Sequence, residues 1–453
     1  MAERRKSIHG EWSSRTAFVL AATGSAVGLG NIWKFPYITG QNGGGAFVLV
    51  YLVSIAAIGI PIMMAEVLIG RRGRRSPINT MRILATEEGR SPYWQLLGWA
   101  GVLAGFLILS YYSVIAGWTI AYIVRMGAGV FQGASADQVS AIFSDLISDP
   151  ERLLAWHTLF MIMTMVVVAR GVRGGLEMAV RFLMPALFVL LLVLVGYSMS
   201  LADFGAGLKF LFQPDFNNIG WNGILAAMGH AFFTLSLGMG AIMVYGSYLP
   251  KHASIAKTSI VIAGVDTLVA LLAGMAIFPI VFAYGLEPGS GPGLIFETLP
   301  IAFGQMWGGS FFGVLFFLLL GFAAWTSAIS LIEPAVAWLV ENHGLSRVSA
   351  SLWAGGITWL LGIGSLLSFN LWKGATFLGM NFFELLDYLT ANIMLPLGGV
   401  AIAVFAAWLM SRSATEEELE LKNRNWFNLW RFLVRYVTPI AVLIVFLNAV
   451  GAL

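Results

Sequence analysis

The chain has 453 residues, of which 58% are hydrophobic and only 11% are charged, and its net charge is +3. Soluble domains carry about a quarter charged residues, so this composition excludes an ordinary water-soluble protein and requires lipid around the chain. The absence of cysteine excludes disulfides, thiolate metal sites and cysteine nucleophiles. The first apolar stretch starts near Arg15, and no small-residue cleavage site closes it. We therefore expect no removed signal peptide.

Apolar segments long enough to cross a bilayer recur along the whole chain. A membrane helix needs about 20 mostly apolar residues. We predict eleven such segments, at about 15–39, 45–70, 94–125, 156–170, 180–201, 221–247, 258–284, 310–340, 349–369, 379–410 and 432–452. The fourth is the weakest, because its apolar part is short, and a start within 151–157 is the alternative. The sequence predicts an all-α polytopic membrane protein.

Basic residues favour one topology for these segments, because lysine and arginine concentrate on the cytoplasmic side of membrane proteins. With the N-terminus inside, all but five of the 26 lysines and arginines lie on the inner side, and the C-terminus lies outside. The five exceptions are Lys34, Arg125, Arg152, Lys209 and Lys373. Two long outer loops follow from this topology. Residues 126–155 are polar, and residues 285–309 are rich in glycine and proline, which suits a reentrant lid over a vestibule.

Two of the predicted helices contain interruptions. The first has three glycines within 24–30, and the sixth has paired glycines and hydroxyls within 234–240. Each glycine weakens a helix by about 1 kcal/mol. Matched interruptions five spans apart indicate a transport site, because freed N–H groups suit a carboxylate and freed carbonyls suit a cation. The alternative is close helix packing through small residues, which is our interpretation of Gly101 and Gly105.

Ionisable residues within apolar spans are expensive to bury and are usually functional. They are Glu66, Asp266, Lys34 and Asp387. A bound cation is the natural partner of Asp266, since an unpaired buried carboxylate is unstable. Lys34 and Asp387 either neutralise each other or face water separately. His230 is interpreted as a core histidine with satisfied hydrogen bonds, and proton coupling is the alternative.

Motifs for enzyme chemistry are missing from the sequence. Gly28-Leu29-Gly30 lacks the strand and helix of a nucleotide-binding fold, and no pair of histidine and glutamate has metal-ligand spacing. We expect no enzyme activity, no nucleic-acid partner and no obligate protein partner. The expected surroundings are membrane lipid.

Four stretches carry a resemblance to a known family. They are Gly24–Pro36 (GSAVGLGNIWKFP), Asn42–Phe47 (NGGGAF), Gly59–Pro61 with Glu66, and Phe232–Gly238 (FFTLSLG). With them, the chain resembles the neurotransmitter:sodium symporters over nearly its whole length. The resemblance implies one transporter domain over residues 1–453, with a core of five-plus-five inverted helices in which helices 1 and 6 are broken. The repeats would cover about 11–201 and 215–410, and 432–452 would be an extra helix.

The resemblance also implies two sodium sites made only of oxygen ligands, as a hard cation requires. The first would combine the Ala26 carbonyl, Asn31, Thr234, Asp266 and the carboxylate of the substrate. The second would combine the carbonyls of Gly24, Val27 and Ala323 with the hydroxyls of Thr326 and Ser327. The implied substrate-contacting residues are Leu29, Gly30, Ile108, Tyr112, Phe233, Thr234, Ser236, Met239 and Leu331.

Gates on both sides follow from the same resemblance. Lys34 and Asp387 match an outer gate, Trp12 matches an inner plug, and a basic residue at or near Arg5 would pair with Glu341. Two further features support these movements. Glu66 would brace the broken helices, and Gly175 with Pro185 fits a Gly-x9-Pro motif whose helix unwinds to open the inner path.

Departures from the family pattern are informative. Many relatives have an amide in place of Asp266 and bind chloride nearby, or carry a glutamate one turn further on, where this chain has Ala270. A fixed carboxylate at Asp266 would supply that negative charge. Lys34 replaces a common arginine and loses its bidentate fork.

These features predict a sodium-coupled symporter in the bacterial inner membrane that imports hydrophobic L-amino acids by alternating access. A transporter of another small zwitterion or osmolyte is one alternative, and a channel or sensor is another. Gly28 favours an amino acid over an amine, since amine-transporting relatives place an aspartate there.

Overall fold

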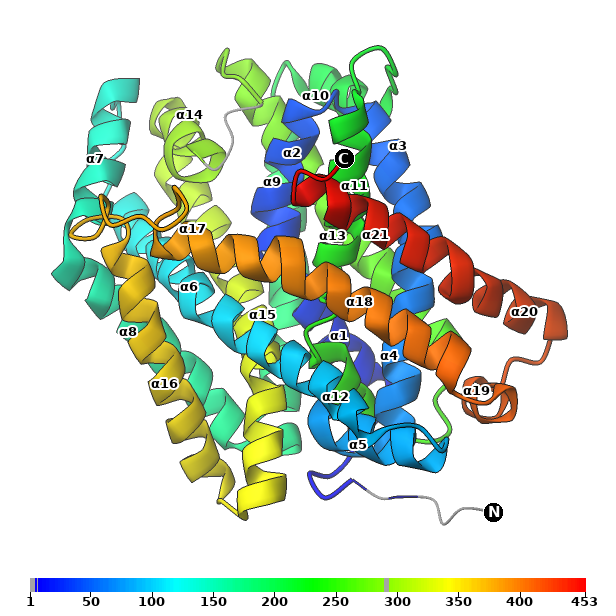
Figure 1. Ribbon diagram of the computed structural model, residues 1–453. Helices are drawn as coiled ribbons and strands as arrows, with labels where there is room; N and C mark the ends of the chain where they lie inside the picture. The colour runs from blue at the N-terminus through cyan, green and yellow to red at the C-terminus, as the bar shows by residue number, and fades with distance from the viewer. Residues whose placement is uncertain (1–4, 6, 289–292) are drawn as a thin grey trace.

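The computed structural model describes residue 5 and residues 7–288 and 293–453, and the named elements in this part are helical (Figure 1). The first half contains α1 (Arg15–Ala26), η1 (Gly30–Lys34), α2 (Phe35–Gln41), α3 (Gly45–Ser54), η2 (Ile55–Gly59), α4 (Ile60–Gly73), α5 (Pro77–Glu87), η3 (Pro92–Trp94), α6 (Gln95–Gly127), α7 (Ala136–Ser148), α8 (Pro150–Ala169), η4 (Val172–Glu177), α9 (Met178–Ser198) and α10 (Phe204–Phe212). Apart from η3, which is a 3₁₀ turn, the η elements are π-helical turns.

The second half contains α11 (Trp221–Thr234), α12 (Ala241–Ser247), α13 (Ile255–Ala283), η5 (Leu294–Thr298), α14 (Leu299–Gln305), α15 (Gly309–His343), α16 (Arg347–Leu367), α17 (Phe382–Asp387), η6 (Tyr388–Met394), α18 (Leu395–Val404), η7 (Phe405–Leu409), α19 (Arg412–Leu419), α20 (Arg424–Phe432), η8 (Leu433–Val437) and α21 (Thr438–Ala449). Several π-helical turns connect two α-helices without a break, so that Phe382–Leu409 and Arg424–Ala449 are each one long helix.

Nine helices in the described ranges are long and apolar enough to cross a membrane, and a bent pair adds a tenth. The bent pair is Arg15–Ala26 with Gly30–Gln41, whose axes differ by 51°. In the sixth predicted segment, α11 and α12 are separated by residues 235–240 and neither is long enough to cross alone. Both discontinuities fall where the glycines predicted them. The count of eleven spans stays a prediction.

The boundaries of three other segments refine the sequence analysis. α8 begins at Pro150, because the Asp149 side chain accepts from Glu151 N at 3.1 Å and Arg152 N at 3.0 Å. The fourth span therefore does extend back, as the alternative allowed. The polar loop 126–155 contains α7, which the analysis missed. The segment 285–309, predicted as a lid, forms η5 and α14, while its residues 289–292 lie outside the described part.

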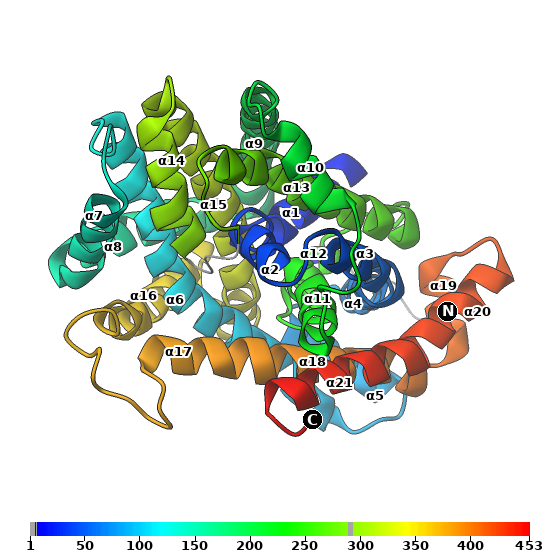
Figure 2. The same ribbon diagram turned by 90° about the horizontal axis from the view of Figure 1, so that it is seen from above.

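The helices form one bundle around the two interrupted segments. Residues 7–14 and α5 lie at one end, called the N-terminal end below, and α7, α10 and α14 lie at the other (Figure 1). α1 contacts α9, α12, α13 and α15, and α12 packs on α4. From above, α2, α11 and α12 lie near the middle, whereas α21 lies outside α18 and contacts both α18 and α11 (Figure 2).

Small residues allow the close packing of the bundle interior. Lipid tails are as apolar as the side chains of membrane helices, so the hydrophobic effect does not drive these helices together. Their association depends instead on close packing. A Cβ added to Gly70 on α4 would lie 1.9 Å from the Met243 carbonyl oxygen on α12. One added to Gly98 on α6 would lie 2.5 Å from Ile78 Cα on α5. The backbones are closer here than any larger residue permits.

A buried ion pair ties helices together at the N-terminal end of the bundle. Glu333 on α15 is fully buried and pairs with Arg347 at the start of α16. Its other carboxylate oxygen accepts from the Tyr248 hydroxyl at 2.8 Å, and Arg347 Nε donates to the Val168 carbonyl at 3.0 Å. The pair therefore connects α15, α16, α8 and the residue that follows α12.

We predict that Glu333→Gln destabilises the protein by about 3 kcal/mol, because removal of one partner leaves a buried charge without compensation. Glu416→Gln is the matched control, since Glu416 is 43% exposed in its pair with Arg412 and such pairs contribute about 0–1 kcal/mol. Denaturant unfolding in detergent, followed by tryptophan fluorescence, measures both. Equal losses for the two variants would contradict this account.

Candidate functional site

The first interruption has an extended backbone at Val27, and the Asn31 side chain stabilises it. Val27 adopts φ −69° and ψ 105°, which ends α1. The Asn31 side-chain oxygen accepts from Gly28 N at 3.0 Å, so a side chain satisfies one of the N–H groups that the helix break frees. A buried backbone donor must be paired with something, and Asn31 supplies that partner.

The second interruption depends on left-handed backbone conformations. Gly238 has φ +83° and Gly240 has φ +76°, which only glycine adopts without strain. Ser236 has φ +55° although it carries a side chain, and its hydroxyl donates to the Ser25 carbonyl at 2.8 Å. That bond joins the second interruption directly to α1. Strain of this kind persists only where surrounding contacts enforce it, and it concentrates at functional sites.

Glu66 on α4 holds the second interruption from behind. Its Oε1 accepts from Gly238 N at 2.6 Å, and the side chain is fully buried. The predicted role of Glu66 as a brace agrees with this contact. Gly101 on α6 packs here too, since an added Cβ would lie 3.2 Å from Gly240 N. An added Cβ at Gly105 would lie 2.9 Å from the Leu331 carbonyl oxygen, so both glycines serve packing, as predicted.

Three residues predicted for the first sodium site meet between the interruptions. Asn31 Nδ2 donates to Asp266 Oδ1 at 2.8 Å and to the Asp266 carbonyl at 3.1 Å. Thr234 Oγ1 lies 3.1 Å from Asp266 Oδ2. All three are at most 2% exposed, and Ala26, the last residue of α1, is buried as well. The donors that reach this carboxylate are neutral, so its charge remains available to a cation.

The residues predicted for the second sodium site also converge. The Ser327 hydroxyl lies 3.5 Å from the Gly24 carbonyl, 3.2 Å from that of Ser25 and 3.3 Å from that of Val27. A hydroxyl has one proton and cannot donate to three acceptors at once. Thr326 Oγ1 donates to the Ala323 carbonyl at 3.1 Å, one turn back on the same helix. The cluster therefore has more oxygen acceptors than hydrogen-bond donors. Such a set of oxygen ligands fits a hard cation such as sodium.

A cavity of about 360 Å³ lies beside these oxygen clusters. Five of the predicted substrate-contacting residues line it, namely Leu29, Gly30, Ile108, Tyr112 and Phe233. The other four, namely Thr234, Ser236, Met239 and Leu331, are buried and do not line it. Leu29 N lies 3.4 Å from the Tyr112 hydroxyl, so tyrosine faces the freed backbone of the first interruption.

Residues that the sequence analysis missed form the far wall of this cavity. They are aromatic or come from the segments between spans, and include Trp33, Tyr37, Trp118, Phe143, Glu297 and Phe383. Phe143 belongs to α7 and Glu297 to η5, which both lie at the end of the bundle opposite the N-terminus. The cavity therefore extends from the interruptions toward that end.

Lys34 and Asp387, the predicted outer gate, both line the cavity. No ion pair joins these two described residues. The Lys34 ammonium instead lies 4.5 Å above the centre of the Phe233 ring. The gate residues thus face the same space while they remain apart.

The opposite side of the site is closed. Trp12 is 1% exposed and donates from Nε1 to the Tyr245 carbonyl at 3.1 Å. Its ring also packs edge-on against Tyr245 and Tyr248. The role of Trp12 as a plug stays a prediction. The cavity thus extends toward α7 and η5, while Trp12 is packed on the other side of the site.

Arg5 itself does not pair with Glu341 in this structure, and its basic neighbours Arg4 and Lys6 lie outside the described residues. Arg5 pairs with Glu87 on α5, and His9 is the N-terminal residue that contacts Glu341, with Nε2 and Oε1 3.0 Å apart. Glu341 also accepts from Ser76 N at 2.8 Å and Asn79 Nδ2 at 2.7 Å. The described residues before Trp12 form no helix, so sequence spacing did not determine which basic residue reaches Glu341.

Gly175 and Pro185 lie in one continuous helix formed by η4 and α9. An added Cβ at Gly175 would lie 2.0 Å from the Val167 carbonyl oxygen, and Pro185 removes a backbone donor inside α9. Glu177 of η4 accepts from Ser13 N at 3.0 Å, next to the plug residue Trp12. The predicted unwinding segment is therefore helical here and hydrogen-bonded to Ser13, the neighbour of Trp12.

Comparison with known proteins assigns the chain to a family. A model of the sodium:neurotransmitter symporter family matches residues 9–130 and 138–453, so the chain belongs to that family. It is similar to the uncharacterized sodium-dependent transporter YhdH of Bacillus subtilis, with 40% identity over 98% of both chains. An uncharacterized sodium-dependent transporter of Haemophilus influenzae is 36% identical over 96% of this chain and 97% of its own length.

A solved structure extends the comparison to the fold. The crystal structure of MhsT in complex with L-phenylalanine is 46% identical and has a TM-score of 0.89, covering 97% of this chain and 99% of that one. The chain is thus a multi-pass, sodium-coupled membrane transporter and not an enzyme, which confirms those predictions.

We predict that Gly28→Ala weakens sodium binding by about tenfold or more, or ~1.4 kcal/mol. The added Cβ would lie 2.5 Å from Ser327 Oγ and 3.2 Å from the Tyr112 hydroxyl, which forces the oxygen cluster apart. Gly321→Ala is the control on the same helix as Ser327, since its Cβ meets nothing closer than 3.6 Å. Sodium titration of tryptophan fluorescence measures both variants. A wild-type sodium affinity for Gly28→Ala would refute this reading of the cluster.

Proposed function

We propose that the protein imports hydrophobic L-amino acids, aliphatic and aromatic, together with two sodium ions by alternating access across the bacterial inner membrane. The N-terminus would be cytoplasmic and the C-terminus extracellular. The proposal includes eleven spans, with inverted repeats over about 11–201 and 215–410. The observation that carries it is a buried, oxygen-rich cluster at Asp266 next to a largely apolar cavity, whose lining residues Gly30 and Phe233 directly precede Asn31 and Thr234.

The chemistry of the cavity favours an amino acid. Its floor offers the Tyr112 hydroxyl and the freed backbone at Leu29, which suit a carboxylate, and its walls are mostly aliphatic and aromatic. The added Cβ at Gly28 already conflicts with Ser327 and Tyr112, so no side-chain carboxylate fits there to hold an amine. A substrate that carries its own carboxylate fills this role. The structural relative MhsT was crystallised with L-phenylalanine, which supports the same substrate class.

The positions of the gates support alternating access. Trp12 packs on Tyr245 at the N-terminal side, while the described residues Lys34 and Asp387 form no ion pair on the other side, which supports a site closed at the N-terminal side alone. Pairing of Lys34 with Asp387 would close the cavity above a bound substrate. Release on the N-terminal side would then require Trp12 to leave Tyr245 and the segment at Gly175 to unwind.

An inward sodium gradient should drive uptake of labelled phenylalanine and leucine into proteoliposomes, and an equal potassium gradient should not. Unlabelled aliphatic and aromatic amino acids should compete, because the walls are apolar, while lysine and glutamate should not. The rate and the competition are measured by filtration. Uptake at the same rate in potassium would contradict the sodium coupling. Competition by a small osmolyte or amine in preference to these amino acids would favour the alternative substrate class.

A further inference from the structure

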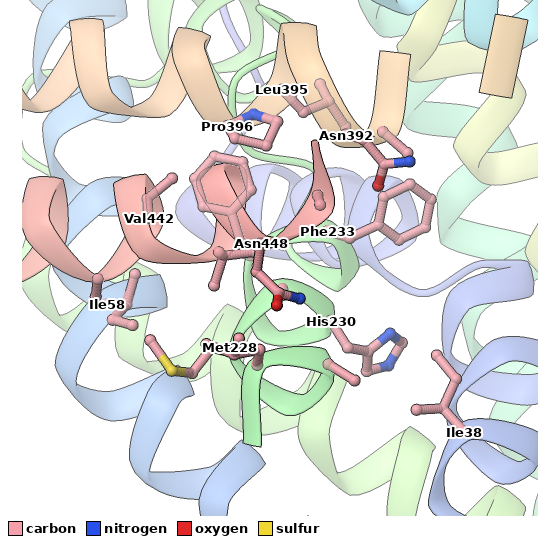
Figure 3. A pocket seen from close by; sticks show the side chains of 18 of the residues that line it. Ile38, Ile58, Met228, His230, Phe233, Asn392, Leu395, Pro396, Val442 and Asn448 are labelled. Atoms are coloured by element: carbon pink, nitrogen blue, oxygen red, sulfur yellow. The ribbon is translucent and has the colours of Figure 1, made fainter. Parts of the chain in front are cut away.

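A second cavity, of about 330 Å³, lies between α11, η6–α18 and α21. Figure 3 shows His230, Asn392 and Asn448 around it, with Phe233 between the first two. Its volume is at the lower end of the range for small-molecule sites, which is about 300–1,000 Å³. Lys34 and Phe233 line both this cavity and the one beside the sodium clusters, so they form the wall between the two.

His230 in this wall is buried without a hydrogen bond. It is 2% exposed, and its ring lies against Phe35 and Tyr51, with centroid distances of 5.9 and 5.5 Å. Neither ring nitrogen has a partner among the described residues. The interpretation of His230 as a satisfied core histidine is therefore wrong. A buried polar group left unpaired is unfavourable, so a ligand that forms a hydrogen bond with it would bind more tightly.

The charge of the cavity wall indicates what this ligand is. Lys34 is the one charged side chain among the described lining residues, and no carboxylate lines the cavity. The remaining polar groups are the carboxamides of Asn222, Asn392 and Asn448, and the rest of the wall is apolar. One ammonium, one unpaired imidazole and an apolar channel complement an anionic head on an aliphatic chain.

The position of the cavity indicates where the ligand comes from. α21 lies at the edge of the bundle, outside α18, and most of its surface is available to lipid (Figure 2). The Tyr388 hydroxyl donates to the Ala449 carbonyl at 3.4 Å, which links η6 to the end of α21 beside the cavity. At Gly229, an added Cβ would lie 3.3 Å from Val445, so α11 and α21 are in close contact. The cavity is one helix away from the membrane.

We propose that this cavity binds the carboxylate head of an aliphatic amphiphile from the membrane, with the carboxylate at Lys34 and His230 and the chain along α11 and α21. This goes beyond the proposed amino-acid transport. A carboxylate there would hold Lys34 on the α11 side and away from Asp387. The bound amphiphile would thus keep the outer gate from closing.

Photolabelling with a diazirine-bearing dodecanoate tests the proposal in proteoliposomes without sodium or amino acid, so that the result does not depend on transport. We expect the label on peptides of α11 and α21. Unlabelled dodecanoate should displace it about tenfold better than dodecanol or dodecyltrimethylammonium, because only the carboxylate pairs with Lys34 and His230. Equal displacement by the three chains, or labelling elsewhere, would overturn the proposal.

Two variants and a control complete the test. His230→Phe keeps the aromatic contacts and removes both ring nitrogens, and it should reduce labelling by about tenfold. Ala226→Trp should do the same by filling the cavity while His230 stays. His343→Phe is the control, since His343 packs on Trp338 at the end of α15 and does not line the cavity. Undiminished labelling of Ala226→Trp would overturn the proposal even if His230→Phe failed to fold.

Discussion

The contact of Asp266 with both helix interruptions is the interaction on which the rest of the structure depends. This one carboxylate, on α13, accepts from Asn31 after the first interruption and from Thr234 before the second. At membrane depth a carboxylate is costly unless donors and a positive charge offset it. The two side chains supply donors without charge. In the proposed mechanism a sodium ion would supply the charge, and the same contact that aligns the two broken segments would form its site.

Two kinds of contact surround the site: those that fix the second interruption, and those made by the predicted gate residues. Beside Asp266, Glu66 and Ser25 fix the second interruption to α4 and α1. The predicted gate residues Lys34 and Trp12 each contact an aromatic residue in this structure. Lys34 lies on Phe233, and Trp12 lies on Tyr245, so each gate has a resting partner. The proposed alternating access would exchange these partners and would also unwind the segment at Gly175, around the contacts of Asp266, Glu66 and Ser25.

Much of this centre could be predicted from residue type alone. Glycines in apolar segments predicted where α1 and α11 end, and polar residues in apolar spans indicated that Asn31, Thr234 and Asp266 would meet, because both features are costly in a membrane helix. That a cation binds at Asp266 stays a prediction. The left-handed Ser236 and the pairing of His9 with Glu341 could not be predicted, since each depends on which segments meet. The cavity wall from α7 and η5 was missed for the same reason, as polar connecting segments have no periodicity that indicates what they cover.

Sodium binding to Asp266→Asn tests the account most directly, with the exposed Asp137→Asn as control. Asp266→Asn keeps the shape of the side chain and removes its negative charge. The account predicts that sodium affinity falls by about tenfold or more in chloride-free buffer, or ~1.4 kcal/mol, and recovers in part when chloride is added. Asp137→Asn should bind sodium like the unmodified protein. Full sodium affinity of Asp266→Asn without chloride, or a strong chloride requirement of the unmodified protein, would contradict it.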